Sequence, residues 1–201
     1  MTKITQADRL IRHVRKRGFV RPRDLGPLGI PRTVLARLVE SDRLVRHSRG
    51  IYTAPDHNTT EHSDLAAVTA RAPMVVVCLL SALRFHDLTT QNPAAVWIMI
   101  GGKSRPPAIA HPPLRIVRAS GPALEKGIEN HTIEGVSVRI TNPAKTVADC
   151  FRYRSAIGTD IALEALRDCW RRRKATMDEI HRYARIDRVA NVMRPYLETL
   201  A

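Results

Sequence analysis

Three short helical segments followed at once by two strand-like runs occupy the first 53 residues, and this order constrains the fold more than any other feature. Apolar residues recur at helical spacing over 5–17, where Thr5 can cap a helix and Gly18 can end it. A second, brief helix is predicted at 22–25, because a proline opens it and a glycine follows it. A third helix is predicted over 31–41. The sequence thus begins with a three-helix unit.

The third predicted helix has two distinct faces. Its apolar side chains recur at a spacing that places them on one inward stripe: Val34, Leu35, Leu38 and Val39. The positions between them face outward: Arg32, Thr33, Ala36 and Arg37. The outward face is therefore cationic and includes one small residue.

Two β-like runs, 44–46 and 51–53, follow the third helix and are joined by a polar turn that contains Gly50. This pattern is typical of a two-stranded wing. We therefore predict a winged helix-turn-helix domain over residues 1–56. The stretch Asp56 to Glu61 is polar and lacks periodic apolar residues, so we place a domain boundary there and a second domain at 61–201.

The second domain is predicted to be a mixed α/β effector domain with a small sheet and C-terminal helices, which makes the whole chain α+β. Strand-like stretches occur at 95–100, 114–118 and 136–140. Helices are predicted at 63–71, 75–84, 142–153, 159–173, from 176 onward and at 189–200. In the helix at 159–173, Trp170 is expected to be buried with its apolar neighbours.

Charge indicates the class of partner. The chain has a net charge of +14 at pH 7, and residues 1–52 hold 13 Lys and Arg against 4 Asp and Glu, a balance of +9. Such a concentration of cations favours a polyanion, because binding releases condensed counterions. Arg outnumbers Lys 27 to 6, which suits bidentate phosphate and guanine contacts, although a GC-rich genome would produce the same bias.

Double-stranded DNA is the polyanion that this unit would fit. The major groove admits a helix and shows a distinct pattern for each base pair, so the outward face at 31–41 supplies the candidate base contacts: Arg32, Thr33, Ala36 and Arg37. The wing supplies candidate minor-groove and phosphate contacts: Arg46, His47, Ser48 and Arg49. Arg21 and Arg23 are further candidate phosphate contacts. The alternative is that these are solvated polar surfaces.

Catalytic and metal-binding constellations are weak in this sequence, so we expect no enzyme, no cofactor and no metal. Ser81, His86 and Asp87 lie close in sequence, but Ser81 is inside a predicted helix without a G-x-S-x-G elbow. The expected role of His86 is a backbone hydrogen bond at a helix end. The eight histidines lack H-x-x-x-H spacing and the three cysteines lack C-x-x-C spacing, so the cysteines are expected to be buried apolar residues. Without an apolar span or a secretory signal, a cytoplasmic protein with no membrane partner is expected.

The N-terminal strings Gly29–Glu40, Arg43–Arg46 and Arg49–Tyr52 resemble the winged domain of the AbiEi-type antitoxins of type IV toxin-antitoxin systems. Strings from the rest of the chain resemble the effector domain of the same family: Leu80–Gln91, Asn142–Phe151 and Met193–Glu198. The resemblance implies a bacterial transcriptional repressor of its own toxin-antitoxin operon. It also implies that the C-terminal domain neutralises a nucleotidyltransferase-like toxin without forming a stable complex with it.

Two alternatives remain open from the sequence. The chain could be a single-role winged-helix regulator whose C-terminal domain dimerises or senses a ligand. The run Arg171 to Lys174 suits a helix end, where the helix dipole favours cations. Together with Arg152 and Arg154, the same run is also a candidate RNA contact of the C-terminal domain.

Overall fold

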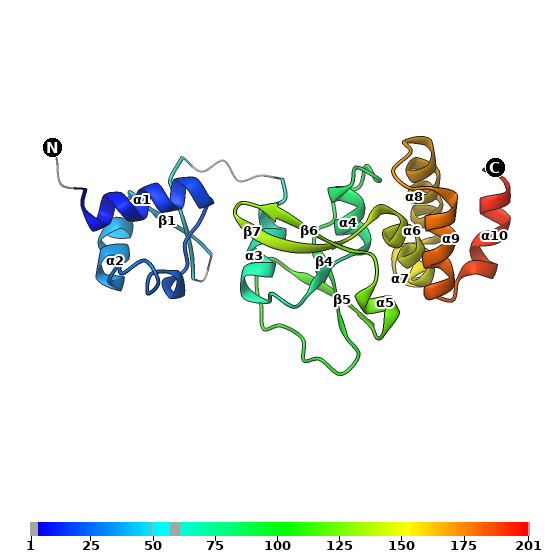
Figure 1. Ribbon diagram of the computed structural model, residues 1–201, viewed down its shortest axis with the longest axis horizontal. Helices are drawn as coiled ribbons and strands as arrows, with labels where there is room; N and C mark the ends of the chain where they lie inside the picture. Colours follow the sequence, from blue (N-terminus) through cyan, green and yellow to red (C-terminus); the bar gives the residue numbers. More distant parts are fainter. Residues whose placement is uncertain (1–3, 49, 57–60, 201) are drawn as a thin grey trace. The chain divides into compact units, whose positions relative to one another are not determined.

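The structure is a computed structural model that describes residues 4–48, 50–56 and 61–200 (Figure 1). It divides into two compact units, and it confirms the predicted α+β class. Unit 1 comprises Met1–Ala70 together with Thr132–Ser137, and unit 2 comprises Arg71–His131 together with Val138–Ala201. The expected boundary at 56–61 falls largely on residues 57–60, which lie outside the described residues. Within the described ranges, no helix is long and apolar enough to cross a membrane.

Unit 1 contains the helices and the hairpin expected near the N-terminus. Its elements are α1 (Gln6–Arg17), η1 (Pro22–Asp24), α2 (Arg32–Glu40), β1 (Val45–Ser48), β2 (Ile51–Thr53) and α3 (Ser63–Arg71). Thr5 caps α1 by accepting the Asp8 N–H, and the Asp8 carboxylate accepts the Thr5 N–H in return, which completes a capping box. Gly18 ends α1 at a positive φ of 86°, as its position in the sequence predicts.

One apolar core holds the first three helical segments of unit 1 and the hairpin together. The three helical segments and the residues that lead into the hairpin all contribute buried side chains to it. They include Leu10, Val14, Leu25, Leu38 and Leu44. Val20 joins the hairpin to the helices, because its N–H and C=O both bond to Tyr52 at 2.8 and 3.0 Å. The hairpin is thereby fixed relative to α1 and α2.

Unit 2 is built on a five-stranded sheet with the strand order β5-β4-β3-β7-β6. The strands are β3 (Val76–Val77), β4 (Val96–Gly101), β5 (Leu114–Ala119), β6 (Ile128–Ile133) and β7 (Val136–Thr141). Strand β3 pairs antiparallel with β4 and parallel with β7. The register aligns Val76, Met99 and Val117 across three strands, and all three are buried in the main core. The predicted strands thus share one sheet, as expected.

The helices of unit 2 gather beside this sheet (Figure 1). They are α4 (Leu79–Phe85), α5 (Pro122–Glu125), α6 (Pro143–Arg152), α7 (Arg154–Ile157), α8 (Thr159–Arg171), α9 (Met177–Ile186) and α10 (Ala190–Glu198). Helix α6 is central, because it contacts α4, α8 and α9. Asn142 caps α6 by accepting the Lys145 N–H at 2.8 Å, and Thr176 and Glu179 form the predicted capping box of α9.

Three features of unit 2 differ from the sequence-based expectations. The helix expected at 75–84 is instead the short strand β3 followed by α4, since Cys78 is extended and Leu79 has a positive φ of 48°. Strand β6 and the short helices α5 and α7 were not predicted. The expectation that Trp170 is buried is wrong, because its side chain lies at the end of α8 and is 37% exposed.

Candidate nucleic-acid interface

Helix α2 presents the cationic face that the sequence predicts. Leu35 and Leu38 are buried, whereas the outward positions are all exposed: Arg32, Thr33, Ala36 and Arg37. The helix begins after Pro31, whose φ of −63° suits a helix start, and the backbone N–H of Ser41 closes its last turn onto Arg37 O. This local geometry fixes the spacing of the four outward side chains on one face.

Neither arginine on this face is neutralised within the part of the chain that the structure describes. Arg32 and Arg37 have no ion pair there, whereas the nearby Arg43 lies 3.6 Å from a carboxylate oxygen of Asp8. Hydrogen bonds from Thr5, with a smaller effect of Arg43, hold the pKa of Asp8 below its usual range. Arg37 also borders a hollow of about 450 Å³ between α1 and α2. The two guanidinium groups of α2 are therefore available to an external anion.

The hairpin β1–β2 lies next in the chain and carries the second set of predicted contacts. Arg46 pairs in register with Tyr52, and its side chain is exposed. His47 and Ser48 belong to strand β1 and not to the turn, and the register shifts between Arg46 and Ser48. Arg49 lies outside the described residues, as do the side chains of His47 and Ser48. Gly50 has a φ of +79°, a conformation that favours glycine in such a turn.

Arg21 and Arg23 make contacts within unit 1. The Arg21 guanidinium forms a bidentate pair with Asp24 at 2.8 and 3.0 Å, and it also donates to Ala70 O at 3.3 Å. Arg23 donates to the same carbonyl oxygen at 2.9 Å. Arg21 is partly buried and Arg23 is exposed. Both arginines therefore link the segment around η1 to the C-terminal end of α3.

The Ser81, His86 and Asp87 group has the structural role that the sequence favours over catalysis. His86 ends α4 and is buried, and its Nε2 lies 2.7 Å from Thr141 O. Because a carbonyl oxygen only accepts, Nε2 carries the proton, and burial lowers the pKa of this imidazole. Ser81 Oγ accepts the Trp97 N–H at 2.9 Å and so holds α4 to β4. The three cysteines are buried, as predicted.

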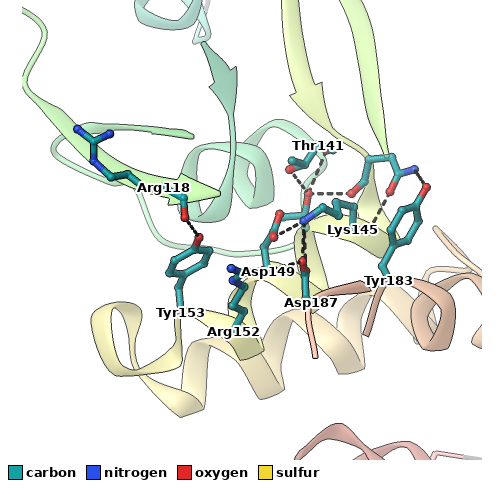
Figure 2. Close-up of polar contacts among 10 residues, drawn as sticks. Arg118, Thr141, Lys145, Asp149, Arg152, Tyr153, Tyr183 and Asp187 are labelled. Atoms are coloured by element: carbon teal, nitrogen blue, oxygen red, sulfur yellow. Dashed lines mark hydrogen bonds and ion pairs between the residues drawn. The ribbon is translucent and has the colours of Figure 1, made fainter. Parts of the chain in front are cut away.

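A buried charged cluster in unit 2 was missed by the sequence reasoning (Figure 2). Lys145 Nζ contacts Asp149 on the same helix and lies 3.2 Å from both carboxylate oxygens of Asp187, which caps α9. Arg152 lies 3.4 Å from Asp187, and its own side chain is only partly buried. The side chains of Lys145, Asp149 and Asp187 are fully inaccessible to solvent. This cluster therefore pins α6 to the end of α9.

Burial raises the pKa of the Asp149 carboxyl well above its usual range, against the lowering effect of the Lys145 ammonium. The second carboxylate, Asp187, raises it further. A sequence signal for this cluster existed, because 143–151 is apolar or small on nearly all faces around Lys145, and such a helix is normally buried.

The comparisons with known proteins point to the same N-terminal segment. A family model described as "Transcriptional regulator, AbiEi antitoxin" matches residues 8–55, which confirms the predicted resemblance over that segment. A comparison with curated proteins finds no match. Among solved structures, the RV2827C protein from Mycobacterium tuberculosis matches with a TM-score of 0.60 and 14% sequence identity, covering 91% of this chain and 72% of that chain. At this identity the likeness shows the fold alone.

Proposed function

We propose that this chain is a sequence-specific DNA-binding regulator that reads double-stranded DNA with a winged helix-turn-helix in unit 1. The observation that carries the proposal is the exposed pair Arg32 and Arg37, which lack acidic partners in the described chain and share one face of α2. The major groove of B-DNA is about 12 Å wide and admits a helix of this kind. The family match over residues 8–55 supports the same assignment.

Each element of unit 1 has a distinct role in this proposal. Arg32 and Arg37 donate to guanine edges, Thr33 bonds to a base or phosphate, and Ala36 leaves room for a thymine methyl group. The wing residues Arg46 and Arg49, with His47 and Ser48, lie along the adjacent minor groove and its phosphates. Arg23 is exposed and can offer its remaining donors to a phosphate. The pairing of Arg21 with Asp24 makes it a positioning residue for this segment.

We further propose that the regulated genes are those of the chain's own toxin-antitoxin operon, in the cytoplasm of a bacterium. In this scheme residues 1–56 bind the operator, and residues 61–201 neutralise a nucleotidyltransferase-like toxin without a stable complex. Support comes from the description of the matching family, a transcriptional regulator and antitoxin. Further support comes from the downstream strings Leu80–Gln91, Asn142–Phe151 and Met193–Glu198, which resemble the same family.

A binding titration tests the DNA-reading role. The probes are a duplex covering the region upstream of the chain's own gene and a shuffled duplex of equal length. Changing Arg32 or Arg37 to Ala is expected to weaken binding to the upstream duplex by about 1 to 3 kcal/mol each, with a smaller loss on the shuffled duplex. Arg194→Ala, at an exposed position of α10 in unit 2, is the matched control and should change neither affinity.

Equal losses on the two duplexes would make Arg32 and Arg37 phosphate contacts and would remove α2 as the reading helix. If neither duplex binds the wild-type chain at low salt, the proposal that this protein binds DNA is wrong.

A further inference from the structure

A second cationic surface lies in unit 2, where a hollow of about 700 Å³ opens at the turn between α8 and α9. Figure 1 shows these two helices next to each other. Its volume falls within the range of roughly 300–1,000 Å³ that is typical of small-ligand sites. The side chains that matter for its chemistry are Trp170, Arg173, Lys174 and Glu179. All four are exposed.

Trp170 gives this hollow an aromatic wall. Among the described residues, four large apolar side chains are exposed, and Trp170 is the one aromatic ring in that group. Its neighbours Leu166 and Cys169 are buried in the core of unit 2, whereas Trp170 lies at the surface. An indole in this setting leaves apolar area in water, and a planar ligand that stacks on it would cover that area.

The charges around the hollow are unevenly paired. Asp168 neutralises Arg171 and Arg172, whose nitrogens lie 2.7 and 3.4 Å from its two carboxylate oxygens. Arg173 and Lys174 have no acidic partner within the part of the chain that the structure describes. Two unpaired cations thus lie beside an exposed indole, and this combination suits an anion that carries an aromatic ring.

Glu179 is the one carboxylate on the wall, and it is committed to the capping box of α9. It accepts the Thr176 N–H at 2.8 Å and the Thr176 hydroxyl at 3.0 Å. These hydrogen bonds hold the pKa of Glu179 below its usual range. Since Asp168 already neutralises Arg171, the wall keeps two unpaired cations, Arg173 and Lys174, against one carboxylate.

We propose that this hollow binds single-stranded nucleic acid, with one unpaired base stacked on Trp170 and the adjoining phosphates held by Arg173 and Lys174. An unpaired base offers a free π face, whereas the faces of paired bases are covered by their neighbours in the duplex. The chemistry recognised is a base joined to a phosphodiester, and RNA and single-stranded DNA both provide it.

This site is narrower than the RNA surface expected from the sequence, because it keeps members of the run Arg171 to Lys174 and leaves out Arg152 and Arg154. Arg152 is held by Asp187 at 3.4 Å, and Arg154 donates to Phe151 O at 2.8 Å. Neither of these arginines lines the hollow. The site is also separate from the proposed duplex-binding face, which belongs to unit 1.

The full chain allows a direct test by tryptophan fluorescence. The probe is a single-stranded oligoribonucleotide of about 12 nucleotides. It is titrated in the presence of saturating unlabelled duplex DNA, which fills the proposed duplex-binding face of unit 1. Stacking on Trp170 is expected to quench part of the emission, and the quenching should disappear in Trp170→Phe. Because Trp170→Ala and Trp170→Phe lack this signal, their affinity is measured by the anisotropy of a fluorescein-labelled oligoribonucleotide. It should fall about tenfold in Trp170→Ala and much less in Trp170→Phe.

Two glycine substitutions form a matched pair for the phosphate contact. Arg173 and Arg188 both have positive φ, 52° and 59°, and each follows the end of a helix, so glycine fits the backbone at both positions. Arg173→Gly is expected to lose at least fivefold in affinity with an unchanged or higher melting temperature. Arg188→Gly should keep the wild-type affinity.

Equal losses of affinity in Arg173→Gly and Arg188→Gly would show that only the overall positive charge matters, and the proposed site would be wrong. Absence of quenching, or displacement of the single strand by further duplex, would overturn it as well. An oligodeoxyribonucleotide of the same sequence distinguishes RNA from single-stranded DNA as the ligand. Equal binding supports recognition of base and phosphate alone, and stronger RNA binding supports an added 2′-hydroxyl contact. Neither result bears on the duplex-binding proposal for unit 1, which the titration with duplex DNA tests separately.

Discussion

At the scale of single residues, the most telling side chains are charged groups whose partners lie far away in the sequence. The outward position of Arg32 and Arg37 follows from helical periodicity alone, and both side chains are exposed in the structure. In contrast, Arg21 and Arg23 bond to Ala70, 49 and 47 residues away, and Lys145 bonds to Asp187, 42 residues away. Local patterns reveal which face a residue occupies, but they carry no information about a distant acceptor.

The buried Asp149 gives a pH-dependent prediction. Its folded-state pKa is raised by burial, so the unfolded chain releases this proton at a lower pH than the folded chain does. The protonated Asp149 carboxyl therefore contributes its full stabilisation below the ordinary carboxyl pKa of about 4. This stabilisation is lost as pH rises toward the folded-state pKa of Asp149. Relative to Asp149→Asn, the wild-type unfolding free energy should fall by about 1.4 kcal/mol for each unit by which the pKa is raised.

Urea unfolding of both proteins across the acid and neutral range measures this difference, and the other carboxylates cancel in the comparison. Asp178→Asn, at an exposed position in the first turn of α9, is the matched control and should follow the wild type. A wild-type advantage that grows with rising pH would show the opposite, namely that Lys145 stabilises Asp149 as an anion.

At the scale of elements, capping residues account for most of the sequence-based success. Thr5, Asn142 and Thr176 each begin a helix where the sequence places it, because their side chains satisfy N–H groups that the helix leaves unpaired. The failures lack such signals. A short apolar run such as 75–84 fits a buried strand or a buried helix equally well, and β6 alternates too weakly to be recognised.

The hairpin is the element for which the proposed DNA contact makes a distinct prediction. Phosphate contacts are independent of sequence and release counterions, so Arg46→Ala or Arg49→Ala should weaken binding to the upstream and shuffled duplexes alike. Each substitution should also lower the slope of log affinity against log salt by about one. Titrations at several salt concentrations measure the slope, with Arg194→Ala as the control. An unchanged slope would take the hairpin out of the contact surface.

At the scale of the whole molecule, unit 1 includes residues on both sides of the polar stretch that follows Asp56. Unit 1 runs to Ala70 and includes the turn Thr132–Ser137, and a small cavity in it is lined by Phe19 and Ile51 together with alanines of α3. The polar stretch after Asp56 marks a break in hydrophobic periodicity. It does not reveal that α3 lies against Phe19 and strand β2, because that contact joins residues far apart in the sequence.

The last prediction concerns the separation of the two proposed roles. A fragment that ends at residue 60 lacks Ala70, whose carbonyl oxygen accepts hydrogen bonds from both Arg21 and Arg23. A fragment 1–70 should therefore be more stable than a fragment 1–60 by roughly 2 kcal/mol, about 1 kcal/mol for each lost hydrogen bond. Point variants avoid this loss. The full chain with Arg32→Ala and Arg37→Ala should therefore fail to repress its operon, yet still protect growth when the adjacent toxin is expressed.

Residues 61–201 alone should behave in the same way, and residues 1–70 should bind the upstream duplex without protecting growth. A reporter for the operon and a growth assay with induced toxin read the two roles separately, and a cooperative melt establishes that each protein folds. Loss of both roles in the folded double variant would tie toxin neutralisation to DNA binding. A folded 61–201 fragment that cannot protect growth would instead place part of the antitoxin activity in residues 1–60, which that fragment lacks.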